Sequence, residues 1–303
     1  LAAYSLARDW RRHDSETPLT IITAEDGDFY SKPLLSTALA KHKTLDELVI
    51  AKGAKQAQQF NAELLTQQSV KALDTINQKI MLDDQTLQYS QCVLALGGQS
   101  ITVPLSGDAS DAVLSVNSLM DYRLLQPKIK QSRRVLVMGA GLVGMELAND
   151  MSAIGIEVTL VDPAKLPLTA LLPKQLGEVM VQVFSDANID WRLGSAVNEI
   201  CRVNDVYQVR LSTQETIEVD AIISAVGIQP NISLAQAAGL TVNRGIVVDQ
   251  YCQASTPGIF ALGDCAEVMG QWRPHIMPIM HCSKALSQTL VGEKTPVHYP
   301  VMP

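Results

Sequence analysis

The sequence predicts an α/β fold with parallel strands, and three observations support this. The strand candidates are continuous apolar runs, which suit parallel strands covered on both faces. Residues 135–162 place a glycine-rich turn between such a run and a helical pattern. Residues 1–25 repeat the helix and strand that would follow such a turn. The length of 303 residues favours about two domains.

The glycine-rich turn follows the strand candidate Val135–Met138. Gly139, Gly141 and Gly144 give the spacing G-x-G-x-x-G. Gly139 allows the tight turn, Gly141 has no Cβ to keep a pyrophosphate from the backbone, and Gly144 lets the helix pack closely on the strand. The helix N-terminus offers unpaired N–H groups and a partial positive charge to phosphates. These features predict a dinucleotide-binding βαβ unit.

The acid that completes this unit is Asp162, which ends the second apolar run. It follows Gly144 by 162 − 144 = 18 residues, near the ~20 expected of a ribose-binding carboxylate. A carboxylate accepts hydrogen bonds from a free 2′-hydroxyl and repels a 2′-phosphate, so Asp162 favours NADH over NADPH. Lys165 would offset part of that repulsion.

The chain opens on a second, incomplete unit of the same kind. Residues 1–10 have helical spacing, residues 19–23 form a strand candidate, and Glu25 follows this strand as Asp162 follows its own. The first strand and the first two glycines of this unit would precede residue 1. We therefore expect a fragment or a gene model that starts late. The alternative is an ordinary N-terminal helix–strand unit.

A third motif lies at Gly263-Asp264, where the apolar strand candidate Ile259–Leu262 ends and small residues follow. A carboxylate here can accept hydrogen bonds from sugar hydroxyls, and the following helix start can face a pyrophosphate. The alternative is an aspartate that only caps a helix.

Composition excludes several classes of function. The formal net charge of −7 argues against a nucleic-acid partner. No apolar run approaches the ~18 residues of a membrane span, and no signal peptide is visible. The five cysteines have no C-x-x-C spacing, which argues against a zinc ribbon and a close redox pair. Scattered cysteines fit a reducing, cytoplasmic location, and the five scattered histidines indicate no metal site.

Together the motifs resemble the FAD-dependent pyridine-nucleotide oxidoreductases, which are flavoproteins with two dinucleotide-binding domains. The resemblance covers essentially the whole chain and is carried by residues 94–98, 139–144, 224–227 and 260–267. Within this family, residues 22–36, 242–249 and 277–280 are similar to bacterial rubredoxin–NAD(+) reductases. Many related ferredoxin reductases carry an Arg-Pro pair where this chain has Lys32-Pro33.

The resemblance implies two Rossmann-like dinucleotide-binding domains. An NAD domain at 108–230 would be inserted in a discontinuous FAD domain at 1–107 and 231–303. Family members also carry an N-terminal glycine loop, and they continue beyond Pro303 into a small C-terminal interface domain. Since both are missing here, we expect this chain as given to bind FAD poorly.

The resemblance also implies the roles of site residues. Lys32 would lie beside the flavin and favour negative charge on its reduced form, as would the helix start after Pro278, and Glu146 would orient the nicotinamide. The alternatives are a solvated loop charge for Lys32 and a helix-surface carboxylate for Glu146. The cofactor-binding candidates are Ala3, at the position of the third glycine of the FAD loop, Glu25, Lys32, Pro33, Val70, Gly97, Gly139, Gly141, Gly144, Asp162, Gly227, Gly263 and Asp264.

The activity implied is transfer of electrons from NADH through FAD to a one-electron carrier, with rubredoxin as the first choice. Disulfide reductases of the superfamily place a close cysteine pair where this chain has none, so electrons are expected to leave the flavin singly. The alternatives are a reductase of ferredoxin or flavorubredoxin, an NADH oxidase, and a non-enzymatic NADH-binding scaffold or sensor of the apoptosis-inducing-factor type. We expect a monomer or weak oligomer.

Overall fold

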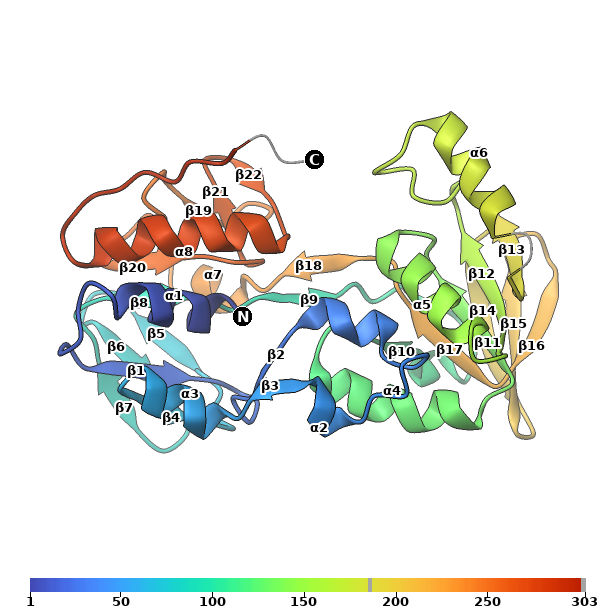
Figure 1. Ribbon diagram of the computed structural model, residues 1–303, viewed down its shortest axis with the longest axis horizontal. Coiled ribbons are helices and arrows are strands. Elements are labelled where there is room, and N and C mark those ends of the chain that lie inside the picture. The colour runs from blue at the N-terminus through green and yellow to red at the C-terminus, as the bar shows by residue number, and fades with distance from the viewer. Residues whose placement is uncertain (185–186, 301–303) are drawn as a thin grey trace. The chain divides into compact units, whose positions relative to one another are not determined.

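The computed structural model describes residues 1–184 and 187–300, which form two compact units (Figure 1). Unit 1 comprises Leu1–Tyr30, Val49–Gln99 and the described part of Gln229–Pro303. Unit 2 comprises Ser31–Leu48 and Ser100–Ile228. Residues 31–48 therefore group with unit 2, whereas the sequence-based division keeps them with the first segment. The assignment of a cofactor to each unit stays a prediction.

Unit 2 is built on a five-stranded parallel sheet. Its central strand β11 has Val135, Leu136 and Val137 fully buried, because the sheet is covered on both faces. From β11 the chain adds β12 and β13 on one side and β17 on the other, as in a doubly wound fold. The prediction of an α/β fold is confirmed. The strand order is β10 (Leu114–Ser115), β17 (Ala221–Ser224), β11 (Arg134–Met138), β12 (Glu157–Asp162) and β13 (Ile189–Leu193).

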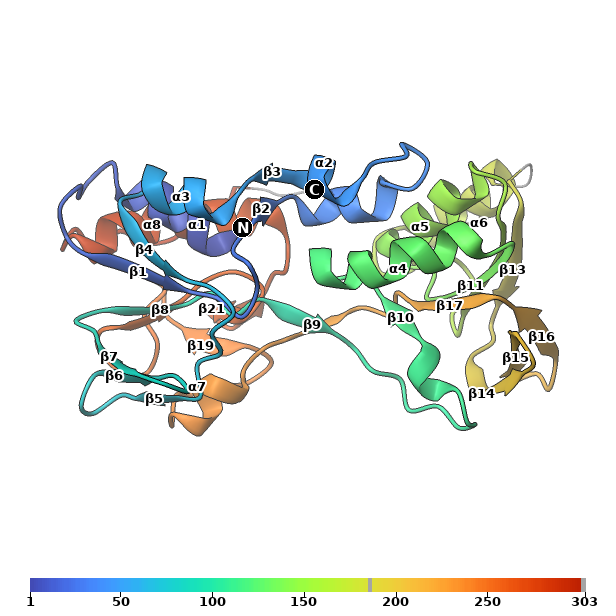
Figure 2. The ribbon, with the colours of Figure 1, turned by 90° about the horizontal axis from the view of Figure 1, so that it is seen from below.

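Different layers cover the two faces of this sheet (Figure 2). Helices α4 (Leu119–Gln131) and α5 (Leu142–Ser152) lie on one face. An antiparallel sheet of β14 (Val197–Val203), β15 (Val206–Leu211) and β16 (Thr216–Val219) lies on the other. Leu136 and Ile222 from the parallel sheet pack with Ile200 and Val209 from the antiparallel sheet in one buried cluster. The core of unit 2 thus joins both sheets.

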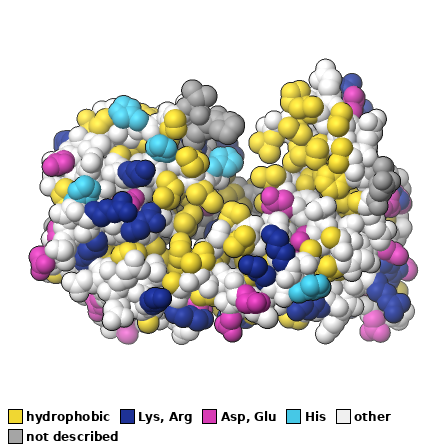
Figure 3. All heavy atoms as spheres, in the orientation of Figure 1, with side chains coloured by type: hydrophobic (Ala, Val, Ile, Leu, Met, Phe, Trp, Pro, Cys, Tyr) yellow, Lys and Arg dark blue, Asp and Glu magenta, His cyan; other side chains and the backbone are white. Residues whose placement is uncertain are grey.

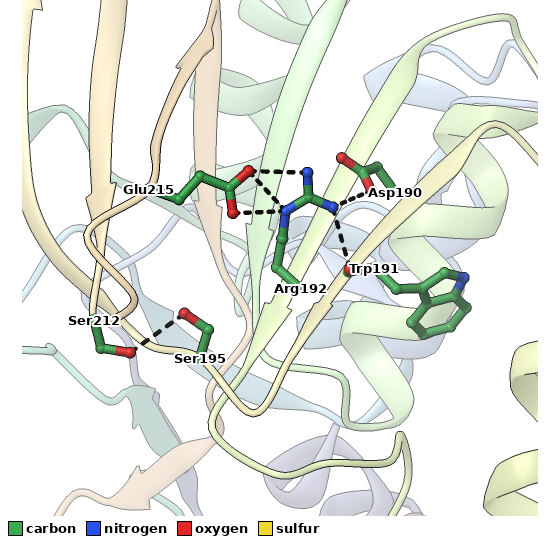
Figure 4. A network of polar contacts seen from close by, with 6 residues as sticks. All are labelled: Asp190, Trp191, Arg192, Ser195, Ser212 and Glu215. Carbon is green, nitrogen blue, oxygen red and sulfur yellow. Dashed lines mark hydrogen bonds and ion pairs between the residues drawn. The ribbon is translucent and has the colours of Figure 1, made fainter.

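At one edge of unit 2, a helix is followed by the outermost strand of the parallel sheet. Helix α6 spans Lys174–Val183, residues 185 and 186 lie outside the described residues, and β13 begins at Ile189. Residues 189–193 extend because they pair in register with β12. Arg192 on β13 also binds the carboxylate of Glu215, with its Nε 3.0 Å from both oxygens, and contacts Asp190 (Figure 4).

Unit 1 contains several smaller sheets. Three pairings are parallel: β1 (Leu19–Ile22) with β4 (Ala62–Leu65), β8 (Cys92–Leu94) with β20 (Ile259–Ala261), and β19 (Ile246–Val248) with β21 (Ala266–Val268). The antiparallel pairings join β21 to β22 (Gln271–Trp272), β2 (Phe29–Tyr30) to β3 (Val49–Ala51), and β6 (Lys79–Met81) to both β5 (Ala72–Asp74) and β7 (Thr86–Gln88). The remaining elements are α2 (Leu45–Leu48) and η2 (Ser110–Ala112) of unit 2, α3 (Gly53–Gln59) and α7 (Ser233–Ala237) of unit 1, and the crossing strands β9 (Gly98–Ser100) and β18 (Ile228–Pro230).

Two helices from opposite ends of the sequence pack together in unit 1. Helix α1 (Ala2–Trp10) lies along α8 (Ile276–Leu290) (Figure 1). The Ser283 hydroxyl donates to the Asp9 carboxylate at 2.7 Å, and both side chains are buried. The final helix starts at Ile276 rather than at the predicted residue 278, since Pro278 fits a first turn that needs no backbone N–H. Within residues 1–184 and 187–300, no helix is long and apolar enough to cross a membrane.

Candidate functional site

The glycine loop between β11 and α5 has a separate physical reason for each glycine. Gly139 has φ +102°, and a Cβ there would lie 2.6 Å from the Ala225 carbonyl oxygen. A Cβ on Gly144 would lie 1.8 Å from the Gly139 carbonyl oxygen. A Cβ on Gly141 would meet nothing within 4 Å. Gly139 and Gly144 are therefore needed for packing of the loop itself, whereas Gly141 leaves a strip of backbone open to a ligand.

The start of α5 lies where the order of the parallel sheet reverses. Gly141 is the N-cap of α5, and no side chain caps the helix. On the neighbouring strand β17, the Ser224 hydroxyl is buried and has no hydrogen-bond partner among the described residues. Gly227 follows with φ +115°. Ligands of open α/β sheets bind at such a reversal, and an uncapped helix start favours an anion.

Asp162 holds the glycine loop from the end of β12. One carboxylate oxygen accepts a hydrogen bond from the Ala140 N–H at 2.7 Å, and the other accepts from the Ala164 N–H at 2.7 Å. Each carboxylate oxygen has a further lone pair. The side chain is therefore fixed beside the loop and keeps acceptor capacity for a sugar hydroxyl.

The two catalytic candidates are both tied to one short helix of unit 2. Lys32–Thr37 form the 3-10 helix η1, which Pro33 favours at its first turn. Lys32 Nζ donates to Asn117 Oδ1 at 3.2 Å. The Ser36 hydroxyl donates to Glu146 Oε2 on α5 at 2.5 Å. Lys32 and Glu146 thus lie on connected elements, although neither bonds to the other.

A second acid on α5, which the sequence patterns do not reveal, holds the residues that follow η1. Asp150, one turn beyond Glu146, accepts hydrogen bonds from the backbone N–H groups of Leu39 at 2.7 Å and Ala40 at 3.1 Å. Burial raises the pKa of Asp150, against the opposing effect of these two hydrogen bonds and of Lys41. The contacts span more than a hundred residues of sequence, so local spacing held no signal for them.

In unit 1, three predicted parts of the FAD site lie together: the first turn of α1, the Gly263-Asp264 turn and the end of β8. Gly263 has φ +85°, and a Cβ there would lie 3.0 Å from the Ala2 side chain, so the first turn of α1, which includes Ala3, lies against Gly263-Asp264. The backbone N–H of Leu262 donates to the Leu94 carbonyl at 3.1 Å. The Asp264 carbonyl accepts a hydrogen bond from the Trp272 indole at 2.7 Å, which holds the turn.

The remaining unit 1 candidates lie on loops at strand ends. The Gln67 N–H donates to the Glu25 carbonyl at 3.0 Å, so the loops after β1 and β4 are joined, and Val70 follows on the second loop. Gly97, after β8, has φ +66° and open space at its Cβ position. Its carbonyl accepts from the Asn231 N–H at 3.0 Å. Gly97 thus leaves open space at the end of β8, as a dinucleotide site at strand ends requires.

One helix start of unit 1 also fits an anionic cofactor. Helix α8 begins after His275 and has no side-chain cap. The first N–H groups of this helix lack intrahelical acceptors. With the open backbone at Gly97, these features fit the phosphates and polar ring edge of a bound dinucleotide.

One segment that carries the resemblance has a structural role. The buried carboxylate of Glu267 accepts hydrogen bonds from Asn243 Nδ2 and from the Gly245 N–H, both at 3.0 Å. The hydrogen bond from Asn243, followed by that from Gly245, lowers the pKa of Glu267. A Cβ on Gly245 would lie 2.9 Å from the Glu267 nitrogen. Residues 242–245 thus form a turn that anchors β19 beside β21.

The structure brings together two cysteines that are distant in sequence. Cys252 and Cys282 are both free and buried, and the two thiols interact electrostatically. This contact with Cys282, together with burial, raises the pKa of Cys252. The Cys282 sulfur also lies 3.2 Å from the Tyr299 hydroxyl. Both sulfurs are buried, so neither thiol is accessible for disulfide exchange with an external partner.

Comparison with known proteins agrees with this architecture. The model of the pyridine nucleotide-disulphide oxidoreductase family matches residues 1–288. A rubredoxin-NAD(+) reductase of Alcanivorax borkumensis is 41% identical, over 100% of this chain and 80% of the relative. A nitric oxide reductase FlRd-NAD(+) reductase of Aeromonas salmonicida is 40% identical, over 99% of this chain and 77% of the relative.

Solved structures show the same fold. A ferredoxin reductase from Rhodopseudomonas palustris superposes with a TM-score of 0.91 at 27% identity, covering 99% of this chain and 76% of that one. The covalent putidaredoxin reductase–putidaredoxin complex gives a TM-score of 0.90 at 26% identity, covering 100% of this chain and 75% of that one. The chain belongs to the pyridine nucleotide-disulphide oxidoreductase family.

Proposed function

We propose that this protein passes electrons from NADH through FAD to a one-electron carrier protein, with rubredoxin as the acceptor. The observation that carries the proposal is the open start of α5, where Gly141 leaves backbone free beside the fixed carboxylate of Asp162. The relative named a rubredoxin-NAD(+) reductase, at 41% identity over the whole chain, supports the choice of acceptor.

Unit 2 supplies the residues for NADH. The first N–H groups of α5 and the open backbone at Gly141 would bind the pyrophosphate, and Asp162 would accept hydrogen bonds from the adenosine ribose. The carboxylate favours a free 2′-hydroxyl over a 2′-phosphate, which supports NADH over NADPH. We place the nicotinamide next to Glu146, whose carboxylate is oriented by the Ser36 hydroxyl. Gly227 and the Ser224 hydroxyl would line the same crevice.

Unit 1 supplies the residues for FAD. When bound, FAD supplies the conversion between a two-electron donor and a one-electron acceptor. The start of α8 would offer N–H groups to anionic parts of the cofactor. Ala3, Gly97, Gly263 and Asp264 would line the same site. Glu25 would hold the ribose, with Val70 on the neighbouring loop. The domain limits proposed are 1–107 with 231–303 for FAD, and 108–230 for NADH.

Lys32 and Pro33 are proposed to lie next to the flavin. A cation at that position favours negative charge, and the bond to Asn117 restricts where the Lys32 ammonium can lie. No acid, base or nucleophile of the protein is required for electron transfer. This agrees with the burial of Cys252 and Cys282, whose thiols are not accessible to a disulfide substrate.

A second candidate acceptor is flavorubredoxin. The FlRd-NAD(+) reductase relative, at 40% identity, matches this chain about as well as the rubredoxin-NAD(+) reductase at 41%. Both acceptors would take electrons one at a time from the same flavin. We also propose a cytoplasmic location and no nucleic-acid partner, which the scattered cysteines and the net charge of −7 support.

The test is anaerobic titration of the flavin-loaded protein with NADH, followed by addition of rubredoxin, ferredoxin or oxygen in parallel. NADH should bleach the flavin spectrum, and rubredoxin should restore it fastest. Reduction of ferredoxin but not of rubredoxin would overturn the choice of acceptor, and restoration by oxygen alone would indicate an oxidase. A protein that binds NADH but takes up no flavin would support the scaffold or sensor alternative.

A further inference from the structure

The outer face of α4 carries exposed apolar side chains, which a helix face turned toward water does not require. Its inner face buries Leu119, Tyr122, Leu125, Gln126 and Ile129. On the opposite side, Met120, Leu124 and Pro127 follow one another at spacings of four and three residues, so they form one stripe. Met120 is 49% exposed and Leu124 is 65% exposed. The helix therefore presents apolar side chains to the core and to solvent alike.

Basic side chains flank this stripe on both edges. Arg123 and Lys130 lie on one edge and Lys128 on the other, and all three are exposed. Residues 41–43, Lys-His-Lys, lie against the edge with Arg123 and Lys130, because Gln126 Nε2 donates to the Lys43 carbonyl at 2.8 Å. The result is an apolar centre with a basic rim.

The charge of this surface is opposite to that of the chain as a whole. Residues 41–43 and 119–131 contain five Lys or Arg and one acid, whereas the whole chain has a net charge of −7. The single acid, Asp121, is occupied, since its carboxylate accepts hydrogen bonds from the Asn117 and Ser118 N–H groups at 3.0 and 2.9 Å. Among the described residues, none of the five cations forms a salt bridge. Lys128 Nζ lies 5.8 Å from the centroid of the Tyr207 ring, and Lys41 and Lys43 interact electrostatically with Asp150 and Glu47. Arg123 and Lys130, which are both exposed, are therefore the rim cations that face an acidic partner most directly.

The surface begins close to a residue that the proposed function places beside the flavin. Asn117, which accepts the hydrogen bond from Lys32, directly precedes the N-cap of α4. Met120 lies in the first turn of the helix. A protein docked on this face would therefore sit near Lys32, where a carrier must come to collect electrons.

We infer that this face, Met120, Leu124 and Pro127 with the rim Arg123, Lys128 and Lys130, is the docking surface for a small one-electron carrier protein with an acidic rim around an apolar patch. Opposite charges would steer the encounter and orient the carrier, and apolar contact would hold it. The redox role of the carrier rests on the proposed function, whereas the charge and exposure of the surface do not.

The test compares the double variant Arg123→Glu, Lys130→Glu with the control Lys55→Glu, Lys79→Glu, which changes the net charge equally but lies in unit 1. Binding of an acidic rubredoxin is measured by isothermal titration calorimetry at low and moderate salt. We expect the α4 variant to raise Kd about tenfold at low salt and to flatten its salt dependence. The control should leave Kd unchanged, and neither variant should alter NADH-driven reduction of ferricyanide.

A second pair of variants tests the apolar stripe. Leu124→Gln should weaken rubredoxin binding. Leu176→Gln on α6, over which exposed hydrophobic side chains also gather (Figure 3), should not, although Leu176 is 50% exposed. The inference would be overturned if the Kd for rubredoxin were unchanged in both α4 variants, or if Leu176→Gln weakened rubredoxin binding instead. It would also be overturned if the α4 variants changed only self-association. If NADH reduces no flavin, the proposed function fails, but the calorimetric titration still decides the docking surface because it needs no electron transfer.

Discussion

Helices α4 and α5 belong to the same unit but begin in opposite ways. The first turn of α4 is closed by its own side chains, since the Ser118 hydroxyl accepts from the Asp121 N–H at 3.0 Å and Asp121 accepts from the Ser118 N–H at 2.9 Å. The first turn of α5 starts at Gly141 and has no side-chain cap. A helix start whose first N–H groups are not capped by side chains, and which lies beside open backbone, is suited to an anionic ligand. A helix start capped by its own side chains is not.

The difference depends on more than a missing cap. Helix α6 begins after Pro173 and also has no side-chain cap. Only the start of α5, however, combines the open backbone of Gly141 with the buried hydroxyl of Ser224 and the fixed carboxylate of Asp162. These three features together distinguish the predicted NADH site from an ordinary exposed helix end.

The largest expected effect comes from Gly144→Val. A side chain at this position would collide with the Gly139 carbonyl, so α5 must move away from the loop. We expect unfolding in urea to show a loss of about 1–3 kcal/mol, as for overpacking in a core, and NADH binding to be lost. Unchanged stability would show that the close approach of helix and loop is not required.

Gly141→Ala should separate ligand binding from folding. The added methyl group meets open space, so stability in urea should stay within about 1 kcal/mol of the original, while it blocks approach of a pyrophosphate. We expect the Kd for NADH, measured by quenching of protein fluorescence, to rise about tenfold, which corresponds to about 1.4 kcal/mol. An unchanged Kd would mean that phosphates do not bind at this helix start.

Substitution of Asp150 tests whether α5 also holds in place the segment that carries Lys32. Asp150→Ala removes the acceptor of the Leu39 and Ala40 N–H groups and should cost about 1–3 kcal/mol of stability. Asp150→Asn keeps an oxygen acceptor and should cost less. Equal losses in both variants, measured by urea unfolding, would show that the charge rather than the hydrogen bonding matters.

Ser118→Ala opens the start of α4 without touching α5. Loss of the cap should cost about 1 kcal/mol of stability in urea, with no change in the Kd for NADH. Thr at the same position, in Ser118→Thr, should retain most of the stability because it supplies the same hydroxyl. A weaker affinity for NADH in Ser118→Ala would contradict the separation of the two helix starts.

The smallest effect is a difference in pH dependence between Asp220 and Asp150. Burial opposes ionisation of Asp220, but hydrogen bonds from the Arg134 and Arg133 N–H groups and from the Arg134 side chain outweigh it and lower the pKa. Its contribution to stability is therefore present above the ordinary aspartate value of 3.8 and is lost as the pH falls through the lowered pKa.

The contribution of Asp150 to stability changes with pH in the opposite direction to that of Asp220. Its pKa is raised, so its contribution is present at low pH and is lost as the pH rises through the raised value. Asp220→Asn should flatten the acid side of a stability–pH curve, and Asp150→Asn should flatten the decline above the ordinary aspartate range. The same slope in both variants would contradict these assignments.

Short-range patterns made much of unit 2 predictable. The apolar runs, the glycine spacing and Asp162 all lie within one βαβ unit, where local geometry determines contacts. The buried acid Asp150, the partner of Lys32 at Asn117 and the pairing of Cys252 with Cys282 depend on tertiary packing between distant segments, which spacing does not encode.

Electron transfer from NADH to rubredoxin is tested by the stoichiometry of the anaerobic reaction with the flavin-loaded protein. We expect each NADH oxidised to reduce two rubredoxin molecules, since NADH gives two electrons and rubredoxin takes one. Flavin absorbance should fall on addition of NADH and recover as rubredoxin is reduced. Oxidation of NADH without reduction of rubredoxin, or binding of NADH with no change in flavin absorbance, would contradict it.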